Sequence, residues 1–381
     1  MIIYLGWFFA SVILCLTTLK ASRSTLVLLM TLFMMALGVF VGLSDMLGGY
    51  DRYIYGELFD SIADERLAGR NPWESYAFAF YGTEFGYGTW EILMTYITAN
   101  RYIFIFASTI VIYILLIISL KQYVENTPFA VVIFMGLWFF FTFTYLRQVM
   151  GCTICWLAVR YIIKRNLPLF LLITFIAYSF HNSAIVFLPM YFVPIKKFPI
   201  KWIIGIMVGA LIFGLTPIPQ ALFSAYGEAN DERANIATYA MDAGFRWAYL
   251  MEAIFFLFVI LTNYSKIIIQ RKEIVMLNMA LVFCAILLVF VHSENGGRLG
   301  WFYMIGVICT ISNICIKDKK ILASGILMII VSFLLFFRIL NGWGVLLTPY
   351  KTFFTNGYRE GDIVHEDYEY DPEYDTDKFY R

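Results

Sequence analysis

The sequence predicts an all-α protein whose helices form a polytopic transmembrane bundle of about 12 spans, within a range of roughly 10 to 14. Hydrophobic residues make up 61% of the chain, charged residues make up 14%, and the mean hydropathy is +0.75. These values lie outside the range of soluble globular domains. Apolar segments long enough to cross about 30 Å of hydrocarbon as helices also recur along nearly the whole chain.

The expected spans follow one another with mostly short connections. They cover residues 2–19, 25–43, 102–120, 128–146, 148–163, 167–181, 183–195, 202–218, 247–264, 274–292, 299–316 and 321–338. The first run has no basic n-region and no convincing cleavage site after it, so we expect it to stay as a membrane helix. The run at 183–195 is short and contains Pro189 and Pro194, which favours a broken or tilted helix.

The charged residues separate by side when these spans are threaded from an outside N-terminus. Fifteen of the 28 Lys and Arg residues, but only three of the 27 Asp and Glu residues, then fall in the inside loops. Lys and Arg near helix ends are retained on the cytoplasmic side, which fixes this orientation. The remaining ionisable residues therefore lie on the outer face, and we expect the chemistry there.

The chain is expected to form one polytopic membrane domain, residues 1–340, followed by an extracytoplasmic tail, residues 341–381. Two outer loops of that domain, residues 44–101 and 219–246, are large enough to carry function. Within the first loop we expect surface helices near residues 52–67 and 84–98. The tail is acidic from residue 360 onward and is expected to be mobile there.

Several kinds of chemistry are disfavoured by what the sequence lacks. Cys15, Cys152, Cys155, Cys284, Cys309 and Cys315 all fall within expected spans, so no extracellular disulfide framework is expected. The Cys152-x-x-Cys155 spacing lies inside a span, where packing of small residues is the preferred interpretation. The sequence has no glycine-rich phosphate loop, zinc-type histidine cluster or nucleotide-binding fingerprint, and we expect no nucleic-acid partner.

Arg147 and His181 stand at the outer ends of expected spans, where an ionisable residue suggests function. Arg147 opens a span together with Gln148, and a guanidinium there can hold a phosphate in two-pronged fashion. The alternative is an arginine whose stem simply reaches the interface. His181 lies between two apolar runs, where a neutral imidazole can accept a proton from a sugar hydroxyl; the alternative is a residue that caps the helix turn.

Arg298 lies at another outer turn, just after Gly296 and Gly297. The two glycines allow close approach of the backbone to a ligand or simply form the turn. As an anion-binding residue, Arg298 has a rival interpretation, because Glu294 can pair with it in a structural ion pair.

The first outer loop adds Asp51, Arg52 and Tyr55, a mixture of charge and aromatic surface that suits sugar hydroxyls and sugar rings. Glu84 precedes an expected helix, where a carboxylate also complements the positive helix end, so a cap is its alternative role.

Taken in order, these residues resemble the EpsG family of polysaccharide polymerases, which is related to the Wzy O-antigen and capsule polymerases. The matching elements are Gly49-x-Asp51-x-x-x-Tyr55, Glu84-x-Gly86-Tyr87, Arg147-Gln148, Phe180-His181-x-Ser183-Ala184, Arg298 and Pro349-Tyr350-Lys351. The resemblance covers most of residues 1–355, and the acidic tail from Glu360 has no counterpart in it.

The resemblance implies a bacterial plasma-membrane glycosyltransferase of the GT-C type that acts on the extracytoplasmic face. It would move the growing exopolysaccharide, capsule or O-antigen chain from undecaprenyl diphosphate to the nonreducing-end hydroxyl of an incoming lipid-linked repeat unit. Donor and acceptor would both be undecaprenyl-diphosphate-linked oligosaccharides, with membrane lipid around the protein. A flippase and a chain-length regulator of the same pathway are candidate partners, and no metal or cofactor is implied.

In such a reaction, Arg147 and Arg298 would hold the departing diphosphate, and His181 would orient or deprotonate the acceptor hydroxyl. Asp51 and Glu84 are alternative bases or sugar ligands. The expected substrate-binding residues are Arg52, Tyr55, Gln148, Glu294, Tyr350 and Lys351, of which the last two would line the entrance for the lipid diphosphate.

Two other functions are compatible with these features. A different lipid-linked glycosyltransferase or ligase would use the same outer-face donor but attach one sugar or a finished chain. A lipid-linked oligosaccharide transporter is the second, although transporters typically show internal repeats and midplane charges. The sequence shows no such repeat, and its ionisable residues gather at one face.

Overall fold

The computed structural model describes residues 1–46, 48–49, 51–228, 244–293, 295–355 and 372–381. The chain divides into two compact units. The first unit comprises Met1–Thr153, Ser179–His181 and Gly325–Arg381, and the second comprises Ile154–Tyr178 and Asn182–Ser324. Helix α8 (Leu146–Lys164) begins in the first unit and continues into the second.

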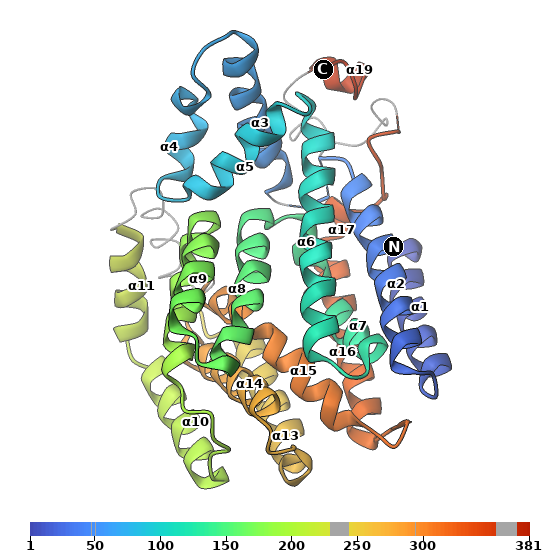
Figure 1. Ribbon diagram of the computed structural model, residues 1–381, viewed down its shortest axis with the longest axis vertical. Coiled ribbons are helices and arrows are strands. Elements are labelled where there is room, and N and C mark those ends of the chain that lie inside the picture. Colours follow the sequence, from blue (N-terminus) through green and yellow to red (C-terminus); the bar gives the residue numbers. More distant parts are fainter. Residues whose placement is uncertain (47, 50, 229–243, 294, 356–371) are drawn as a thin grey trace. The chain divides into compact units, whose positions relative to one another are not determined.

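The first unit is built from helices, drawn in Figure 1 in blue, cyan and, for the C-terminal part, orange to red. Its further elements are α1 (Ile2–Thr18), α2 (Arg23–Leu43), α3 (Arg52–Leu67), η1 (Pro72–Glu74), α4 (Ala77–Tyr81), α5 (Phe85–Thr95), α6 (Arg101–Tyr123), α7 (Thr127–Leu137), η2 (Phe139–Phe143), α16 (Ala323–Gly342), α17 (Gly344–Leu347) and α19 (Pro372–Thr376). Helices α3 and α5 lie where the two surface helices of the first outer loop are expected.

The second unit packs around α14 (Arg271–Val289), which contacts α10, α13, α15 and η6. Its other elements are α9 (Leu167–Phe180), η3 (Asn182–Phe192), α10 (Ile200–Gly214), α11 (Ile218–Glu228), α13 (Trp247–Thr262), η5 (Tyr264–Lys266), η6 (Gly296–Tyr303), α15 (Met304–Cys315), and the two-stranded hairpin β1 (Ile316–Lys317) and β2 (Lys320–Ile321). The last two residues of α9 belong to the first unit.

The apolar helices identify a multi-pass membrane protein. Six described helical segments are long and apolar enough to span a bilayer: Arg23–Leu43, Arg101–Tyr123, Leu146–Lys164, Arg271–Val289, Gly296–Cys315 and Ala323–Gly342. Six shorter apolar helices accompany them: Ile2–Thr18, Thr127–Leu137, Leu167–Phe180, Asn182–Phe192, Ile200–Gly214 and Trp247–Thr262. Each of the expected spans overlaps one of these segments, while the number that cross the membrane stays a prediction.

Two expected spans contain irregular helix. The span expected at 128–146 begins as α7 and continues after Trp138 as the 3-10 helix η2. The span expected at 183–195 is the 3-10 helix η3, with Pro189 inside it. Proline lacks the N–H that a regular α-helix needs, and this accounts for the tighter, broken geometry there.

Helices α2 and α6 run side by side in the first unit (Figure 1), and two glycines of α2 allow their close contact. A Cβ atom at Gly38 would lie 2.9 Å from the ring of Tyr113, and one at Gly42 would lie 2.8 Å from the ring of Phe106. Small residues at such interfaces let membrane helices approach closely.

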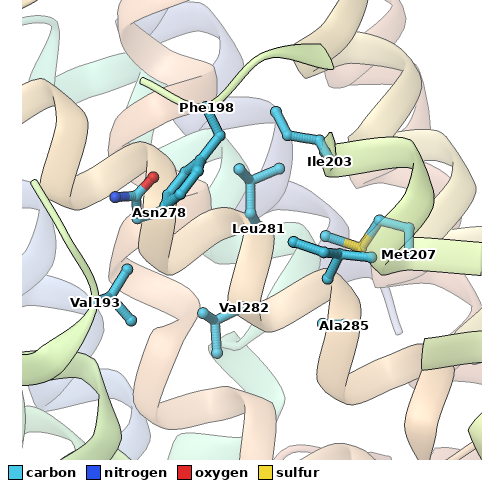
Figure 2. Close-up of a pocket in the computed structure, with 9 residues that line it drawn as sticks. Val193, Phe198, Ile203, Met207, Asn278, Leu281, Val282 and Ala285 are labelled. Carbon is cyan, nitrogen blue, oxygen red and sulfur yellow. The ribbon is translucent and has the colours of Figure 1, made fainter. Parts of the chain in front are cut away.

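An apolar cavity of about 170 Å³ lies within the second unit, between α10 and α14 (Figure 2). Aliphatic and aromatic side chains line it, together with the amide of Asn278, whose Nδ2 donates to the carbonyl of Pro194 at 3.0 Å. Its lining carries no ionisable group, so it is not a candidate for the polar chemistry considered below.

Candidate functional site

The first unit brings three of the expected catalytic residues together. Nη1 of Arg147 donates to Oε2 of Glu84 at 2.6 Å, and Nδ1 of His181 lies 3.8 Å from Oε1 of the same carboxylate. The second distance is longer than a hydrogen bond but short enough for strong electrostatic coupling. Glu84 is 1% exposed and His181 is 7% exposed, so the three groups interact in a largely dry environment.

Aromatic rings surround the guanidinium of Arg147. Its central carbon lies 5.6 Å from the ring centroid of Tyr55, 5.0 Å from that of Phe80 and 5.1 Å from that of Tyr81. Each distance lies within the range of a cation–π interaction, which strengthens when the groups are shielded from water. Nε of Arg147 is buried and has no hydrogen-bond partner among the described residues. The Arg147 side chain as a whole is 13% exposed, so it keeps some accessible surface although it is held on several sides.

The ends of three helices position these groups. Arg147 is the second residue of α8, Glu84 immediately precedes α5, and His181 immediately follows α9. The ends of α5 and α9 touch at Gly86, where a Cβ atom would lie 2.2 Å from Oγ of Ser179 and 2.9 Å from its carbonyl carbon. Only glycine fits this contact, and the contact holds the Glu84 turn against the His181 turn.

A buried carboxyl lies behind the aromatic wall. Glu91 of α5 is fully buried, and its Oε1 accepts a 2.7 Å hydrogen bond from the hydroxyl of Tyr81. Burial raises the pKa of Glu91 well above its usual range, which keeps the group neutral, and this outweighs the lowering by the Tyr81 hydrogen bond and by Arg147. The neutral carboxyl fixes the ring that faces Arg147.

Sequence analysis did not select Glu91, Tyr81 or Phe80. The feature that would have found Glu91 is its place in the otherwise apolar stretch Trp90-Glu91-Ile92-Leu93-Met94, where a carboxyl needs a partner. No comparable feature distinguishes Tyr81 from the many tyrosines nearby, because its role depends on a contact with α8.

Asp51 and Tyr55 lie at the N-terminal end of α3. Asp51 precedes the helix, and its backbone N–H donates to Oγ1 of Thr144 at 2.7 Å. Tyr55 is 4% exposed and faces Arg147; burial raises its pKa to about 12, against the lowering by Arg147. Gln148 follows Arg147 on α8 and is also buried.

Arg52 lies deeper in the first unit and is fully buried. Its guanidinium donates to the carbonyls of Gly42 and Ser44, at 3.0 and 2.7 Å, and to that of Phe143 at 3.3 Å. These contacts satisfy the carbonyls at the C-terminal end of α2. The geometry indicates that Arg52 connects α2, α3 and η2 through these hydrogen bonds. The expected role of Arg52 in substrate binding stays a hypothesis.

Tyr350 and Lys351 lie in the same unit, next to the end of α2. The ring of Tyr350 stacks on Phe40 with centroids 4.2 Å apart, and its hydroxyl donates to the Phe40 carbonyl at 2.6 Å. Lys351 is 5% exposed, and its carbonyl accepts from the backbone N–H of Asp45 at 3.3 Å.

Arg298 belongs to the second unit, in η6, where its guanidinium lies 5.9 Å from the Trp301 ring. It is therefore not assigned to the cluster of Glu84, Arg147 and His181. Glu294 lies outside the described residues, and so does most of the expected outer loop at 219–246, at residues 229–243.

The cluster can bind an anion and move a proton. A guanidinium has five N–H donors, so Arg147 can hold Glu84 and a phosphate oxygen at the same time. The Glu84 carboxylate can stabilise a positive charge that forms on His181 when the imidazole takes a proton. Among the described residues, no group of three or more His, Cys, Asp or Glu side chains is placed to hold a metal ion.

Fold and site together define a multi-pass helical membrane protein with a buried, charged site built at helix ends. The model of the EpsG family matches residues 26–352, which is most of the chain. The chain therefore belongs to the EpsG family, and this membership points to a polysaccharide polymerase-type function. Comparison with curated proteins and with solved structures gives no match.

Proposed function

We propose that the protein polymerises lipid-linked oligosaccharide repeat units. It transfers the growing glycan from undecaprenyl diphosphate to the nonreducing-end hydroxyl of an incoming lipid-linked repeat unit. The observation that carries this proposal is the cluster in which Arg147 and His181 both lie close to the buried carboxylate of Glu84. Membership of the EpsG family supports the same class of reaction.

The guanidinium of Arg147 takes the leaving-group role. As the bond between the anomeric carbon and the diphosphate oxygen breaks, its electron pair goes to the diphosphate, and Arg147 neutralises the charge that develops there. The partly accessible side chain of Arg147 supports this role, because a guanidinium has several N–H donors and binds phosphate oxygens through charge-assisted hydrogen bonds. For Arg298, in the second unit, the role in diphosphate binding that the resemblance implies stays a separate proposal.

His181 takes the proton of the acceptor hydroxyl while the oxygen attacks the anomeric carbon. The carboxylate of Glu84, 3.8 Å from Nδ1, stabilises the resulting imidazolium. The rings of Tyr55, Phe80 and Tyr81 shield the guanidinium from water, which strengthens every charge interaction in the site. A diphosphate is already a good leaving group, so no further acid is required.

The site is proposed to face the outside of a bacterial plasma membrane, in a GT-C-like bundle. Basic residues gather in the opposite loops, and nucleotide sugars are absent outside, so the donor must be lipid-linked. Asp51, Gln148, Tyr350 and Lys351 are proposed to line the path of the glycan and the lipid diphosphate. A flippase and a chain-length regulator are the proposed partners.

The function is tested with purified protein and one defined undecaprenyl-diphosphate-linked repeat unit. A ladder of products at multiples of the repeat is expected. A single addition would support a ligase or a single-sugar transferase instead, and no covalent product with movement of the substrate across vesicles would support a transporter.

Two variants test whether the cluster of Glu84, Arg147 and His181 catalyses formation of the product ladder. Arg147→Lys keeps the charge that Glu84 needs but loses the two-pronged fork, and a rate loss of at least tenfold is expected. His181→Gln keeps polarity but cannot act as a base, and a loss of roughly 100-fold or more is expected. Arg160→Lys is the matched control, because Arg160 lies at the other end of α8 and its Nε donates to the carbonyl of Leu157.

A further inference from the structure

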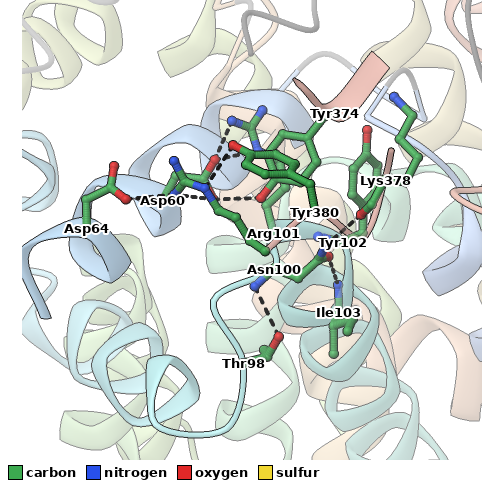
Figure 3. Close-up of polar contacts among 11 residues, drawn as sticks. Asp60, Asp64, Thr98, Asn100, Arg101, Tyr102, Ile103, Tyr374, Lys378 and Tyr380 are labelled. Atoms are coloured by element: carbon green, nitrogen blue, oxygen red, sulfur yellow. Dashed lines mark hydrogen bonds and ion pairs between the residues drawn. The ribbon is translucent and has the colours of Figure 1, made fainter. Parts of the chain in front are cut away.

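The segment 372–381 docks on the C-terminal half of α3 and the N-terminal end of α6, within the first unit (Figure 3). The ring of Tyr374 is fully buried, and the guanidinium of Arg101 lies 4.4 Å from its centroid. The hydroxyl of Tyr374 lies 3.3 Å from Oδ1 of Asp60. One tyrosine of the segment thus contacts residues of both helices.

Further contacts hold the same segment on either side of Tyr374. Nη1 of Arg381 lies 2.8 Å from Oδ1 of Asp64, on α3. Nδ2 of Asn100, which caps α6, donates to the carbonyl of Lys378 at 2.7 Å. Lys378 is 4% exposed, and its ammonium lies 5.3 Å from the ring of Tyr102. Burial of a tyrosine, a lysine stem and several polar contacts is more than a solvated tail would form.

The segment covers an ion pair that joins the two helices. Nε and Nη2 of Arg101, the first residue of α6, both contact the same carboxylate oxygen of Asp60, on α3. Burial raises the pKa of Asp60 to about 6 although Arg101 and Arg381 lower it, so the carboxyl is ionised at neutral pH. A second guanidinium, that of Arg381, lies 4.0 Å from Oδ1 of Asp60.

Helix α3 carries this ion pair at one place and a wall of the candidate site at another. Tyr55, which faces Arg147, precedes Asp60 by five residues, or about 7.5 Å along the helix axis. A rotation or shift of α3 on α6 therefore moves the Tyr55 ring with respect to the guanidinium.

We propose that residues 372–381 are a clamp that fixes α3 on α6 and thereby positions Tyr55 against Arg147. Tyr374 and Arg381 are positioning residues, because neither is assigned a contact with substrate. Residues 372–381 lie outside the part of the chain that the family model matches, residues 26–352. The consequence of the clamp for catalysis rests on the function proposed above.

The clamp is tested by hydrogen exchange of the full-length protein in detergent. In Tyr374→Ala and in Arg381→Ala, exchange of the α3 amides at residues 52–67 is expected to rise roughly tenfold or more, because local opening follows local stability. Tyr374→Phe keeps the ring and is expected to preserve most of the protection. Thr376→Ala is the matched control, since Thr376 lies on the same helix, is exposed, and hydrogen-bonds the Glu373 carbonyl within its own turn.

A catalytic readout separates positioning from simple stability. Tyr374→Ala is expected to lower kcat of repeat-unit transfer at least fivefold with less than a twofold change in KM, and Tyr374→Phe is expected to restore kcat. Unchanged α3 exchange in Tyr374→Ala would overturn the clamp. Looser α3 with an unchanged kcat would overturn its positioning role. If wild-type protein makes no ladder, the proposed function fails while the exchange result still decides the clamp.

Discussion

Arg147 is held by contacts that favour a charged group and yet leave it able to bind. It pairs with Glu84 and lies against three aromatic rings, while its Nε has no partner among the described residues. Removing one partner of a buried ion pair typically costs about 3–5 kcal/mol, because the other charge stays buried alone. A loss of activity in Arg147→Ala could therefore reflect either unfolding or a missing catalytic group. Substitutions that keep the charge, or that remove both charges of the pair, separate the two effects.

Glu91 offers a test of the aromatic wall. Since burial holds its carboxyl neutral, Glu91→Gln retains a neutral oxygen acceptor for the Tyr81 hydroxyl. Stability of this variant is expected to change by less than about 1 kcal/mol, whereas Glu91→Leu should lose on the order of 1–3 kcal/mol by orphaning that hydroxyl. Thermal unfolding in detergent measures both. Equal losses in the two variants would contradict a neutral Glu91.

Asp60 gives a prediction for pH. Its pKa in the folded protein, about 6, lies above its usual value of 3.8 because burial disfavours the charge. Between these values the folded state binds more protons than the unfolded state, so the contribution of Asp60 to stability is fully present below pH 3.8 and is lost as pH rises through 6. The loss is on the order of 3 kcal/mol.

Asp60→Asn cannot ionise and removes this pH dependence. Thermal unfolding of wild type and variant is compared between pH 4 and pH 7, where the wild type should lose stability relative to Asp60→Asn as pH rises. Parallel curves for the two proteins would show that burial does not raise this pKa.

At the scale of helices, the candidate site exists because the ends of separate elements meet. The close contact at Gly86 between α5 and α9 joins the Glu84 turn to the His181 turn, and α8 supplies Arg147 at its own first turn. Helix ends carry unpaired backbone groups and are the natural places for polar chemistry in a membrane protein.

Gly86→Ala tests this meeting of helix ends. The added Cβ would clash with Ser179, so α5 and α9 must separate, and transfer activity is expected to fall at least tenfold because small displacements of catalytic groups are costly. Gly209→Ala is the control, since the space around Gly209 within α10 is open and alanine favours a helix. Both are measured as the rate of ladder formation per folded protein. Full activity of Gly86→Ala would mean that the contact does not position the site.

At the scale of the whole molecule, the positions of the apolar helices along the chain could be predicted from the sequence. The packing between these helices could not. Hydrophobicity is a property of the local sequence, so every expected span overlaps an apolar helix. The change from α7 to η2 after Trp138 was missed, since the 128–146 run is largely apolar and has no proline or charged residue near the break.

The candidate site was partly accessible for the same reason. Arg147 and His181 could be selected because charge at the end of an apolar run is unusual, and Glu84 because it precedes an expected helix. Their meeting at one carboxylate depends on packing between helices far apart in the sequence. The docking of residues 372–381 was not expected either. The acidic composition around that segment predicts a solvated tail. The burial of Tyr374 and Lys378 depends on contacts with α3 and α6, which the local sequence does not indicate.

Sidedness is a property of the whole chain and can be tested with introduced cysteines, because the six native cysteines are free and buried. Leu67, at the end of α3, is 60% exposed, and Lys320, in the β1–β2 hairpin, is also exposed. In intact cells, a membrane-impermeant maleimide is expected to label Leu67→Cys, and to label Lys320→Cys only after permeabilisation. The reverse pattern would place the candidate site in the cytoplasm.

The central claim is that Arg147, held by its ion pair with Glu84, receives a lipid-linked diphosphate, and direct binding of undecaprenyl diphosphate tests it. The double variant Glu84→Gln/Arg147→Gln removes both charges together, so neither is left buried alone. With charged hydrogen bonds worth about 1.5–3 kcal/mol, its affinity is expected to fall roughly 10- to 100-fold, while Arg160→Gln binds like wild type. Wild-type affinity in the double variant would contradict the assignment of the diphosphate to this site.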